Sequence, residues 1–506
     1  MEFLIGNKKK VTLLLLVIIF LLTNTACNKK VVKPDILLIT IDTLRQDYLG
    51  CYGFPLNTSP FIDRLAKEGV IFKHVVTPIP LTDGSHASIL TSLHPLVHQV
   101  LPLTTWLDDK VETIAETLKK NGYYTIGTVS VKHMSRKYNF DQGFDSYSDD
   151  WDKDAYKFNM EWQREAGSVN ESVKLQIDEY LQKYKKREKP LFMWVHYYDP
   201  HFPYCERSDF SFKNSSIKDS KIEYKYAGEI LYTDFRIDEL YQFLEQKGLT
   251  EKLISCITSD HGEQLGEHGY NGAHNDIYSE TIFVPLIFHG YNIPHNRILD
   301  HYVSTMDIAE TLLGLVNLKF ENPVNGIKLF SSDGTPVLPD NKKRDFLIVG
   351  NPDTVRSIQL MTPPSTFIYN FDSKYSSSFF SMSPMGTGLK GDMLKPVPAE
   401  LLRMKYYKKS NKERISIDYP YALRQDLHFA VLQFDVKKDM GFSVGYRLGP
   451  GKAKTSHEFE KKISGTVTAY FPITPLDQPE VYINKRKETE IVNLKYGILT
   501  RKQFSF

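Results

Sequence analysis

Two acidic residues, a histidine and a hydroxyl stand at places in the sequence where they could build a metal site. Asp260 and His261 come directly after an apolar stretch, in the run ITSDHGEQLGEHG. Asp42 ends a second apolar run, and Thr82 precedes a predicted helix. Carboxylate oxygens and imidazole nitrogens bind divalent cations, and the carboxyl ends of parallel strands meet at one edge of a sheet. The sequence therefore predicts a single metal site that contains all four residues.

The elements that must position these residues follow the pattern of an α/β protein. Strand-like apolar runs alternate with segments of helical periodicity, and the connections suit right-handed crossovers between parallel strands. Beyond about residue 335, apolar alternation of period two with Gly, Pro and Asn punctuation predicts antiparallel strands. We expect a mostly parallel central sheet flanked by helices in a catalytic domain over 35–330. A C-terminal antiparallel β-rich subdomain is expected over 335–506.

The predicted elements of the first part can be placed by residue. The strand-like runs are 36–41, 70–76, 124–129, 191–196, 253–257 and 284–288. The helical segments are 60–68, 85–92, 111–121, 168–186, 224–247 and 304–316.

Residues 1–26 have the composition of a secretory signal. Three lysines precede an uninterrupted apolar run, and small and polar residues then lead to Cys27. The apolar run is too short to span a bilayer. The cysteine after Thr25 and Ala26 resembles a bacterial lipoprotein cleavage site, so we expect a lipidated, membrane-anchored chain with 27–34 as its tether. Ordinary signal cleavage is the alternative, and in both cases the protein is exported to the periplasmic or surface face of the cell envelope.

The net charge argues against a nucleic-acid-binding protein, and the cysteine content argues against a fold held by disulfides. The formal net charge of +2 falls to zero once residues 1–26, with three lysines and one glutamate, are removed. Such a chain has no overall positive electrostatic field that would attract nucleic acid. Apart from Cys27, only three cysteines remain among 506 residues, so a large core rather than disulfides must hold the fold. The oligomeric state is left open.

Five ordered blocks resemble the sulfatase family, within the alkaline phosphatase superfamily. They begin at residues 35, 58, 80, 195 and 257, with the sequences DILLITIDTLRQDYLGCYG, TSPFIDRLAKEGVIF, PLTDGSHASILTSLHP, VHYYDPHFPY and ITSDHGEQLGEHG. The resemblance covers roughly residues 35–320 and implies an ester hydrolase with one divalent metal ion. It maps Asp42, Asp260 and His261 onto the family's metal ligands, with Thr82 closing the set. The imidazole favours zinc or manganese, and calcium is the alternative.

The family's nucleophile position is occupied here by Thr82. Sulfatases carry Cys or Ser there, converted to formylglycine, and Arg four positions later, where this chain has His86. The sulfated form of the hydrated aldehyde can release sulfate by elimination. A sulfate ester of threonine cannot eliminate sulfate in this way, whereas a phosphate ester of threonine can be hydrolysed by in-line attack. Thr82 therefore favours a phosphomonoester, phosphodiester or phosphonate ester over a sulfate ester. The alternative is that Thr82 only caps a helix.

Five histidines are predicted to contact the substrate. His201, in the DPHFPY loop, is the candidate that protonates the departing oxygen, because imidazole titrates near neutrality. His196 either binds substrate or merely packs. His86, His268 and His274 match family regions close to substrate or metal ligands, and for His268 and His274 a solvated loop is the alternative.

The leading hypothesis is a metal-dependent hydrolase of sulfate or phosphate esters acting on a small molecule, glycan or lipid. One alternative is a phosphoethanolamine-type transferase, which Thr43 in place of a second acidic residue would suit. No further membrane spans follow the signal, which favours hydrolysis. The other alternative is a catalytically silent binder of anionic glycans or lipid headgroups, which would show no metal-dependent turnover.

Overall fold

The computed structural model of the chain describes residues 33–100, 106–149, 163–185, 187–212, 221–267, 271–274 and 277–338, together with strands between 346 and 499. Its central element is an eight-stranded sheet in the order β10-β2-β9-β6-β1-β5-β3-β4. The strands are β1 (Asp35–Ile41), β2 (Val70–Val76), β3 (Tyr124–Thr128), β4 (Ser146–Ser148), β5 (Leu191–Tyr197), β6 (Leu253–Ser259), β9 (Leu286–Gly290) and β10 (Arg297–Ser304). Every neighbouring pair is parallel except the two that involve β9. The predicted mostly parallel sheet is confirmed.

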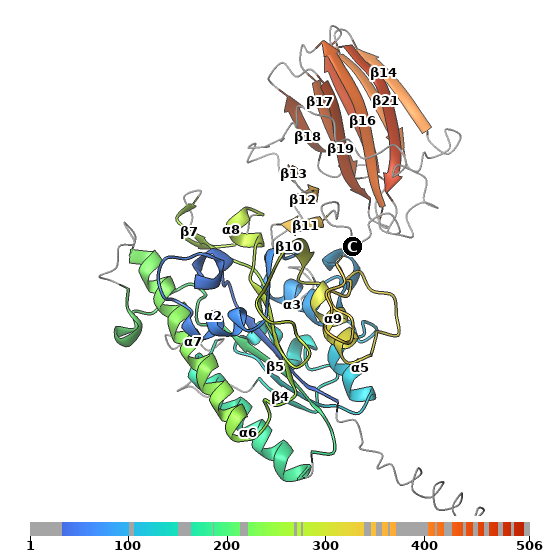
Figure 1. The fold of residues 1–506 in the computed structure, drawn as a ribbon. Coiled ribbons are helices and arrows are strands. Elements are labelled where there is room, and N and C mark those ends of the chain that lie inside the picture. Colours follow the sequence, from blue (N-terminus) through green and yellow to red (C-terminus); the bar gives the residue numbers. More distant parts are fainter. Residues whose placement is uncertain are drawn as a thin grey trace, which may run out of the picture.

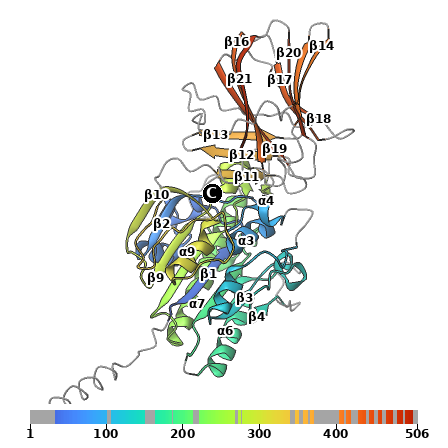
Figure 2. The same ribbon diagram turned by 90° about the vertical axis from the view of Figure 1, so that its right-hand side faces the viewer.

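Helices cover both faces of this sheet, as Figure 1 and the rotated view in Figure 2 show. On one side lie α3 (Thr82–Thr91), α5 (Ile114–Lys120) and α9 (Asp307–Leu315). On the other side lie α2 (Pro60–Lys67), α6 (Ala166–Lys183) and α7 (Lys221–Gln246). The short helices are α4 (Pro95–His98) and α8 (Ser279–Ile282). No helix of the described residues is long and apolar enough to cross a bilayer.

The central strand β1 shows why its sequence is apolar throughout. Ile36 and Leu38 belong to the core on the α3, α5 and α9 side, whereas Leu37 and Ile39 belong to the core on the other side. All four side chains are completely buried. Successive side chains of a strand point to opposite faces, so a strand covered on both faces must be apolar at every position.

Three strands of the sheet differ from the prediction, since β9 has the opposite direction and neither edge strand, β4 or β10, was predicted. The run at 284–288 does form β9, but β9 is antiparallel to both of its neighbours, β2 and β6. The edge strand β10 was not predicted at all. β10 carries the polar residues Arg297, Asp300 and His301, so it lacks the continuous apolar run that marks the central strands.

The start of α2 is capped by a side chain of another helix. Ser59 occupies the N-cap position but makes no capping hydrogen bond. The amides of Phe61 and Ile62 instead donate to the carboxylate of Asp234 in α7, over 2.9 and 2.8 Å. Burial raises the pKa of Asp234 to about 7. The cap is therefore a tertiary contact that joins two helices of the same layer.

The remaining described strands form separate antiparallel sheets. A short hairpin joins β7 (Gln264–Leu265) and β8 (Asn271–Ala273). Beyond residue 345 the pairings are antiparallel in three further sheets, ordered β11-β12-β13, β14-β15-β20-β17-β18 and β19-β16-β21. Their bounds are β11 (Phe346–Gly350), β12 (Ser357–Thr362), β13 (Ser365–Asn370), β14 (Arg403–Lys409), β15 (Lys412–Asp418), β16 (His428–Lys438), β17 (Phe442–Leu448), β18 (Lys454–Phe459), β19 (Gly465–Ile473), β20 (Pro479–Arg486) and β21 (Glu490–Leu499). The period-two pattern of the C-terminal sequence thus corresponds to antiparallel strands.

A buried histidine behind α3 makes the fold sensitive to acid. The amide of Val100 donates to His98 Nδ1 over 3.0 Å, so Nε2 carries the proton and faces Ser88 Oγ at 2.9 Å. Burial lowers the pKa of His98 to about 3, from 6.5. The folded state therefore resists protonation of His98, whereas the unfolded state takes up the proton near pH 6.5. The free energy of unfolding consequently falls as the pH decreases from 6.5 towards 3.

We expect the free energy of unfolding to fall by about 2 kcal/mol more between pH 8 and pH 5 in the wild type than in His98→Gln. Denaturant titrations at the two pH values measure this difference. The exposed His295 offers a matched control, because His295→Gln should keep the pH dependence of the wild type. Equal pH dependence of His98→Gln and the wild type would contradict the assignment.

Candidate active site

The predicted metal site is assembled at the carboxyl ends of the central strands. Asp42 directly follows β1, and Asp260 and His261 directly follow β6. These two strands are parallel neighbours in register, with Ile41 opposite Ser259. Thr82 is the first residue of α3. The exposed fractions are 0% for Asp42, Asp260 and His261 and 7% for Thr82, so all four residues are buried.

The four side chains lie close enough to share one ion. One ligand atom each of Asp42, Asp260 and His261 lies within 4.8 Å of the others. Thr82 Oγ1 is 3.4 Å from Asp42 Oδ2 and 3.3 Å from His261 Nε2. The hydroxyl does not cap α3, because Leu81 holds the N-cap position and makes no side-chain cap. The alternative of Thr82 as a simple helix cap is therefore wrong.

The protonation state of His261 suits a metal ligand. Its Nδ1 lies 3.0 Å from the carbonyl oxygen of Gly262, which can only accept, so Nδ1 carries the proton. Its Nε2 then presents a lone pair towards Thr82 Oγ1 and Asp260 Oδ2, the latter at 3.4 Å. Burial lowers the pKa of His261 to about 4, which keeps the ring neutral. A backbone carbonyl that fixes the tautomer is the usual support of a metal-binding histidine.

Asp260 divides its two oxygens between the backbone and the site. Oδ1 accepts from the amide of His261 at 2.8 Å and from that of Thr43 at 3.2 Å. Oδ2 is buried and has no hydrogen-bond donor among the described residues. Burial raises the pKa of Asp260, and His86 acts against this. A buried carboxylate oxygen that faces an imidazole lone pair fits a cation between them, so the residues present fit a divalent metal.

Thr43, which stands where a second acidic residue was considered, serves this site through its backbone. Its φ of 52° is a left-handed conformation that is strained for a β-branched residue. The conformation turns the Thr43 amide towards Asp260, and Tyr226 Oη donates to the Thr43 carbonyl over 2.7 Å. The same Tyr226 oxygen accepts from the amide of Arg45 at 2.9 Å. A tyrosine of α7 thus fixes the turn that follows Asp42.

His86 lies beneath the site rather than at its mouth. Its Nδ1 donates to the Thr82 carbonyl over 2.7 Å, and its Nε2 accepts from Thr40 Oγ1 at 3.0 Å. The same Thr40 oxygen accepts from Trp194 Nε1 at 3.1 Å, which fixes the direction of this chain. The ring is completely buried, and burial lowers its pKa, so His86 is neutral. This placement suits a residue that orients the start of α3 more than one that contacts a substrate.

His196 is also completely buried. Its Nδ1 lies 2.8 Å from Ser130 Oγ, and its Nε2 lies 3.5 Å from Asp42 Oδ2. Burial lowers its pKa well below the usual value. Of the two predicted roles, packing beside a site carboxylate therefore fits this placement better than substrate contact.

His201 and His274 lie in a row of ring contacts that reaches His261. The His201 ring stacks on Tyr198 with 4.4 Å between centroids and stands edge-on to His274 at 5.7 Å. His274 in turn stacks on the metal-site residue His261 at 4.3 Å, and its Nδ1 donates to the carbonyl of Pro80 over 3.1 Å. His201 is partly exposed. The structure thus brings both residues to the site, whereas the predicted residue His268 lies outside the described residues.

An arginine that the sequence interpretation did not assign connects two loops of the site. Arg45 Nη1 lies 2.7 Å from Glu267 Oε1, and Nη2 lies 2.8 Å from Asp47 Oδ2. Tyr204, two residues after Phe202, donates to Glu263 Oε1 over 2.7 Å. Arg45 is three residues after Asp42 and could have been suspected, but its partner Glu267 lies 222 residues away in the sequence.

The loop that carries His201 is anchored by a buried ion network. Arg207 Nε lies 2.6 Å from Glu229 Oε2, Nη2 lies 3.0 Å from Asp199 Oδ1, and the guanidinium carbon lies 3.5 Å from the centroid of the Tyr232 ring. Asp199 also accepts from the amide of Ala166 at 2.9 Å, at the start of α6. Both carboxylates are completely buried. Arg207 therefore ties this loop to α6 and α7.

We expect Arg207→Ala to lower the free energy of unfolding by about 3–5 kcal/mol, because it leaves two buried carboxylates without their cation. Denaturant titration at pH 7 measures this loss. Arg64→Ala is the matched control, since the Arg64 side chain is 60% exposed and lies 3.5 Å from Asp238, a pair worth about 1 kcal/mol or less. Similar losses for the two variants would contradict the anchoring role.

Comparisons with known proteins agree with this architecture. Among curated relatives, the ulvan-active sulfatase of Formosa agariphila is 27% identical over 58% of this chain and 64% of its own, and human iduronate 2-sulfatase is 24% identical over 53% and 61%. The chain thus spans less than two thirds of the length of either relative. A solved structure in complex with its substrate D-glucosamine-2-N,6-O-disulfate matches with a TM-score of 0.54 at 18% identity, over 67% of this chain and 89% of that one. The phosphonate monoester hydrolase of Agrobacterium radiobacter matches with a TM-score of 0.53 at 15% identity, over the same shares.

These structural likenesses concern the fold alone, as does the match to a structure described as a protein in the alkaline phosphatase superfamily from Vibrio parahaemolyticus, with a TM-score of 0.51 at 18% identity over 67% of this chain and 77% of that one. The family model described as Sulfatase matches residues 34–318, more than half of the chain and all of the elements that carry the site. The chain belongs to the sulfatase family.

Proposed function

We propose that the chain hydrolyses esters of sulfuric or phosphoric acid, with Thr82 as the nucleophile. The observation that carries the proposal is the position of Thr82 Oγ1, 3.4 Å from Asp42 Oδ2 and 3.3 Å from His261 Nε2. A side-chain alcohol beside a carboxylate and a neutral imidazole is oriented for attack. The names of the relatives, which are sulfatases, support hydrolysis of an anionic ester.

The metal ligands in this proposal are Asp42, Asp260 and His261, with Thr82 completing the set. A divalent cation there would offset the negative charge of the ester oxygens and lower the pKa of the attacking hydroxyl. The imidazole favours zinc or manganese over calcium. The amino end of α3 adds backbone N–H groups that suit an anionic group.

The chain's own residues account for the remaining steps. Thr82 Oγ1 gives its proton to Asp42 Oδ2 and attacks the phosphorus or sulfur atom, the bond to the leaving oxygen breaks, and protonated His201 gives that oxygen a proton. Water then attacks the ester formed on Thr82 and gives a proton to His201, while the bond to Thr82 Oγ1 breaks and Asp42 returns the proton to this oxygen. His86 holds the Thr82 carbonyl, so it keeps the first turn of α3 in place during both steps.

The side chain at residue 82 bears on the choice between phosphorus and sulfur. A threonine ester can be released only by a second attack at the central atom, which is ordinary chemistry for phosphorus. The relatives' names point to sulfate esters of glycans, whereas the side-chain chemistry favours a phosphate, phosphodiester or phosphonate ester. We propose that the substrate is an ester of a carbohydrate, and that the chain prefers a phosphoryl ester to a sulfate ester.

The test is a parallel assay of the purified mature chain on aryl sulfate, aryl phosphate and bis-aryl phosphodiester. We expect turnover of a phosphoryl substrate that a chelator abolishes and that zinc or manganese restores. Turnover of the sulfate ester alone would overturn the preference for phosphorus. Turnover that survives complete removal of metal would overturn the metal-dependent mechanism.

We further propose that the protein is exported and anchored to a membrane through a lipid on Cys27. The sequence around this residue supports the proposal. We expect the wild type in the membrane fraction of cells and Cys27→Ala in the soluble fraction. A membrane location that persists in Cys27→Ala would contradict the lipid anchor.

A further inference from the structure

A cavity of roughly 470 Å³ lies away from the proposed active site. Its lining comes from the loop 50–57, the end of α2 and the starts of β2 and β10, where Ile71 pairs with Ile298. The metal-site residues follow the opposite, carboxyl ends of the parallel strands, and none of them lines the cavity. Its volume lies within the range of about 300–1,000 Å³ typical of small-molecule sites. We call it the edge cavity, since β10 is an edge strand of the sheet.

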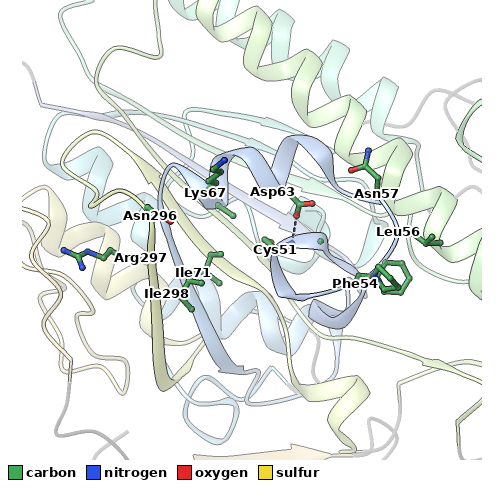
Figure 3. A pocket seen from close by; sticks show the side chains of 13 residues that line it. Cys51, Phe54, Leu56, Asn57, Asp63, Lys67, Ile71, Asn296, Arg297 and Ile298 are labelled. Carbon is green, nitrogen blue, oxygen red and sulfur yellow. Dashed lines mark hydrogen bonds between the residues drawn. The ribbon is translucent and has the colours of Figure 1, made fainter.

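Part of the lining of the edge cavity is apolar. Figure 3 shows Phe54 and Leu56 on one side, and Ile71 and Ile298 on the other, with Cys51 between them. The Phe54 ring stacks on Tyr48 with 4.6 Å between centroids, so it forms a rigid wall. The Ile298 side chain is 59% exposed, an unusual position for a large aliphatic residue. These surfaces can pack against the apolar face of a ring.

The charge of the lining is positive. Lys67 and Arg297 are both exposed and form no ion pair with any residue in the described part of the chain. The single carboxylate of the lining, Asp63, is already engaged, since its Oδ1 accepts from the amide of Cys51 at 2.7 Å and from Ser59 Oγ at 3.0 Å. The amide side chains of Asn57 and Asn296 add hydrogen-bonding groups at the rim. A ligand with negative groups and hydroxyls would complement this rim.

The thiol of Cys51, in the edge cavity, is unsuited to a catalytic role. Burial raises the pKa of Cys51, with nearby Asp63 adding to the effect, so the sulfur stays protonated and a poor nucleophile. Among its lining residues there is no histidine. The edge cavity therefore has the groups of a binding site and lacks those of a second catalytic centre.

We propose that the edge cavity is a second binding site for an anionic saccharide, with the sugar ring against the apolar walls and its sulfate or carboxylate on Lys67 and Arg297. The proposal rests on the proposed function, because it treats the saccharide as a distant part of a polymeric substrate whose ester is cleaved at Thr82. Two linked contacts on one polymer raise its apparent affinity without changing the chemistry of cleavage. Small esters would not use the cavity.

The test measures binding of a fluorescently labelled, sulfated carrageenan hexasaccharide to the full-length chain in the presence of chelator, by fluorescence anisotropy. The desulfated hexasaccharide is the control probe. We expect the double variant Lys67→Ala/Arg297→Ala to bind the sulfated probe about tenfold more weakly or worse. The variant Ile298→Glu should weaken binding of the sulfated probe by a similar factor, because it places a negative charge on the cavity wall that repels the negative probe. The desulfated probe should bind weakly to all chains.

A matched control removes two exposed lysines elsewhere, Lys110→Ala/Lys328→Ala, and should leave binding within about twofold of the wild type. Turnover of the small aryl ester should be unchanged in every cavity variant. Absence of binding to the wild type, equal binding of both probes, or equal affinity of the Lys67/Arg297 variant would overturn the second site. Loss of the proposed function itself would appear separately, as absence of aryl ester turnover in the wild type.

Discussion

Thr82→Ala is expected to lower kcat on the preferred aryl ester by about 10⁴-fold or more, while the chain stays folded. The substitution removes the hydroxyl that lies 3.4 Å from Asp42 Oδ2 and 3.3 Å from His261 Nε2, and loss of a nucleophile has effects of this size in other hydrolases. The helix should survive, because the Thr82 side chain caps nothing and its carbonyl remains available to His86. Steady-state kinetics and thermal unfolding measure the two quantities.

Thr82→Ser is the matched control, since it keeps the hydroxyl and removes one methyl group. We expect it to retain turnover within about tenfold of the wild type. A trapped phosphothreonine, detected by mass spectrometry after rapid quenching, would identify the attacking atom directly. Turnover by Thr82→Ala close to the wild-type rate would refute nucleophilic attack by this residue.

The close approach of Asp42, Asp260 and His261 could be predicted because these residues follow the ends of two strands. The apolar runs before Asp42 and Asp260 mark buried strands, and neighbouring parallel strands bring their carboxyl ends to one edge. A helix was predicted at 85–92, although α3 begins at Thr82 itself. These predictions needed only local patterns.

The roles of the surrounding residues required tertiary contacts that no local pattern contains. His86 stands where the resemblance to sulfatases implies an arginine, yet burial lowers its pKa and keeps it neutral, and Thr40, on β1, completes its hydrogen bonds. Arg45 meets Glu267 only after the strands have paired. The edge strand β10 escaped prediction because a half-exposed strand shares its composition with loops.

Asp260→Asn is expected to raise the thermal stability of the metal-free chain while it abolishes metal binding. In the absence of a cation, the carboxylates of Asp42 and Asp260 are both buried within 4.8 Å of each other and of His261, an arrangement that costs folding free energy. An asparagine keeps the acceptor for the Thr43 and His261 amides and offers its amide hydrogens to His261 Nε2. The gain should be about 1–3 kcal/mol, or several degrees in Tm.

The same variant should lose the response to metal. Zinc or manganese is expected to raise the Tm of the wild type by preferential binding to the folded state, and to leave that of Asp260→Asn unchanged. Ser255→Ala is a matched control on the same strand, because this buried side chain lies outside the site and should leave the metal response intact. A lower Tm for metal-free Asp260→Asn would mean that the carboxylate is stabilised by the fold itself. In that case a cation would not be needed to explain why two acidic residues are buried together, and the metal site would lose its main physical support.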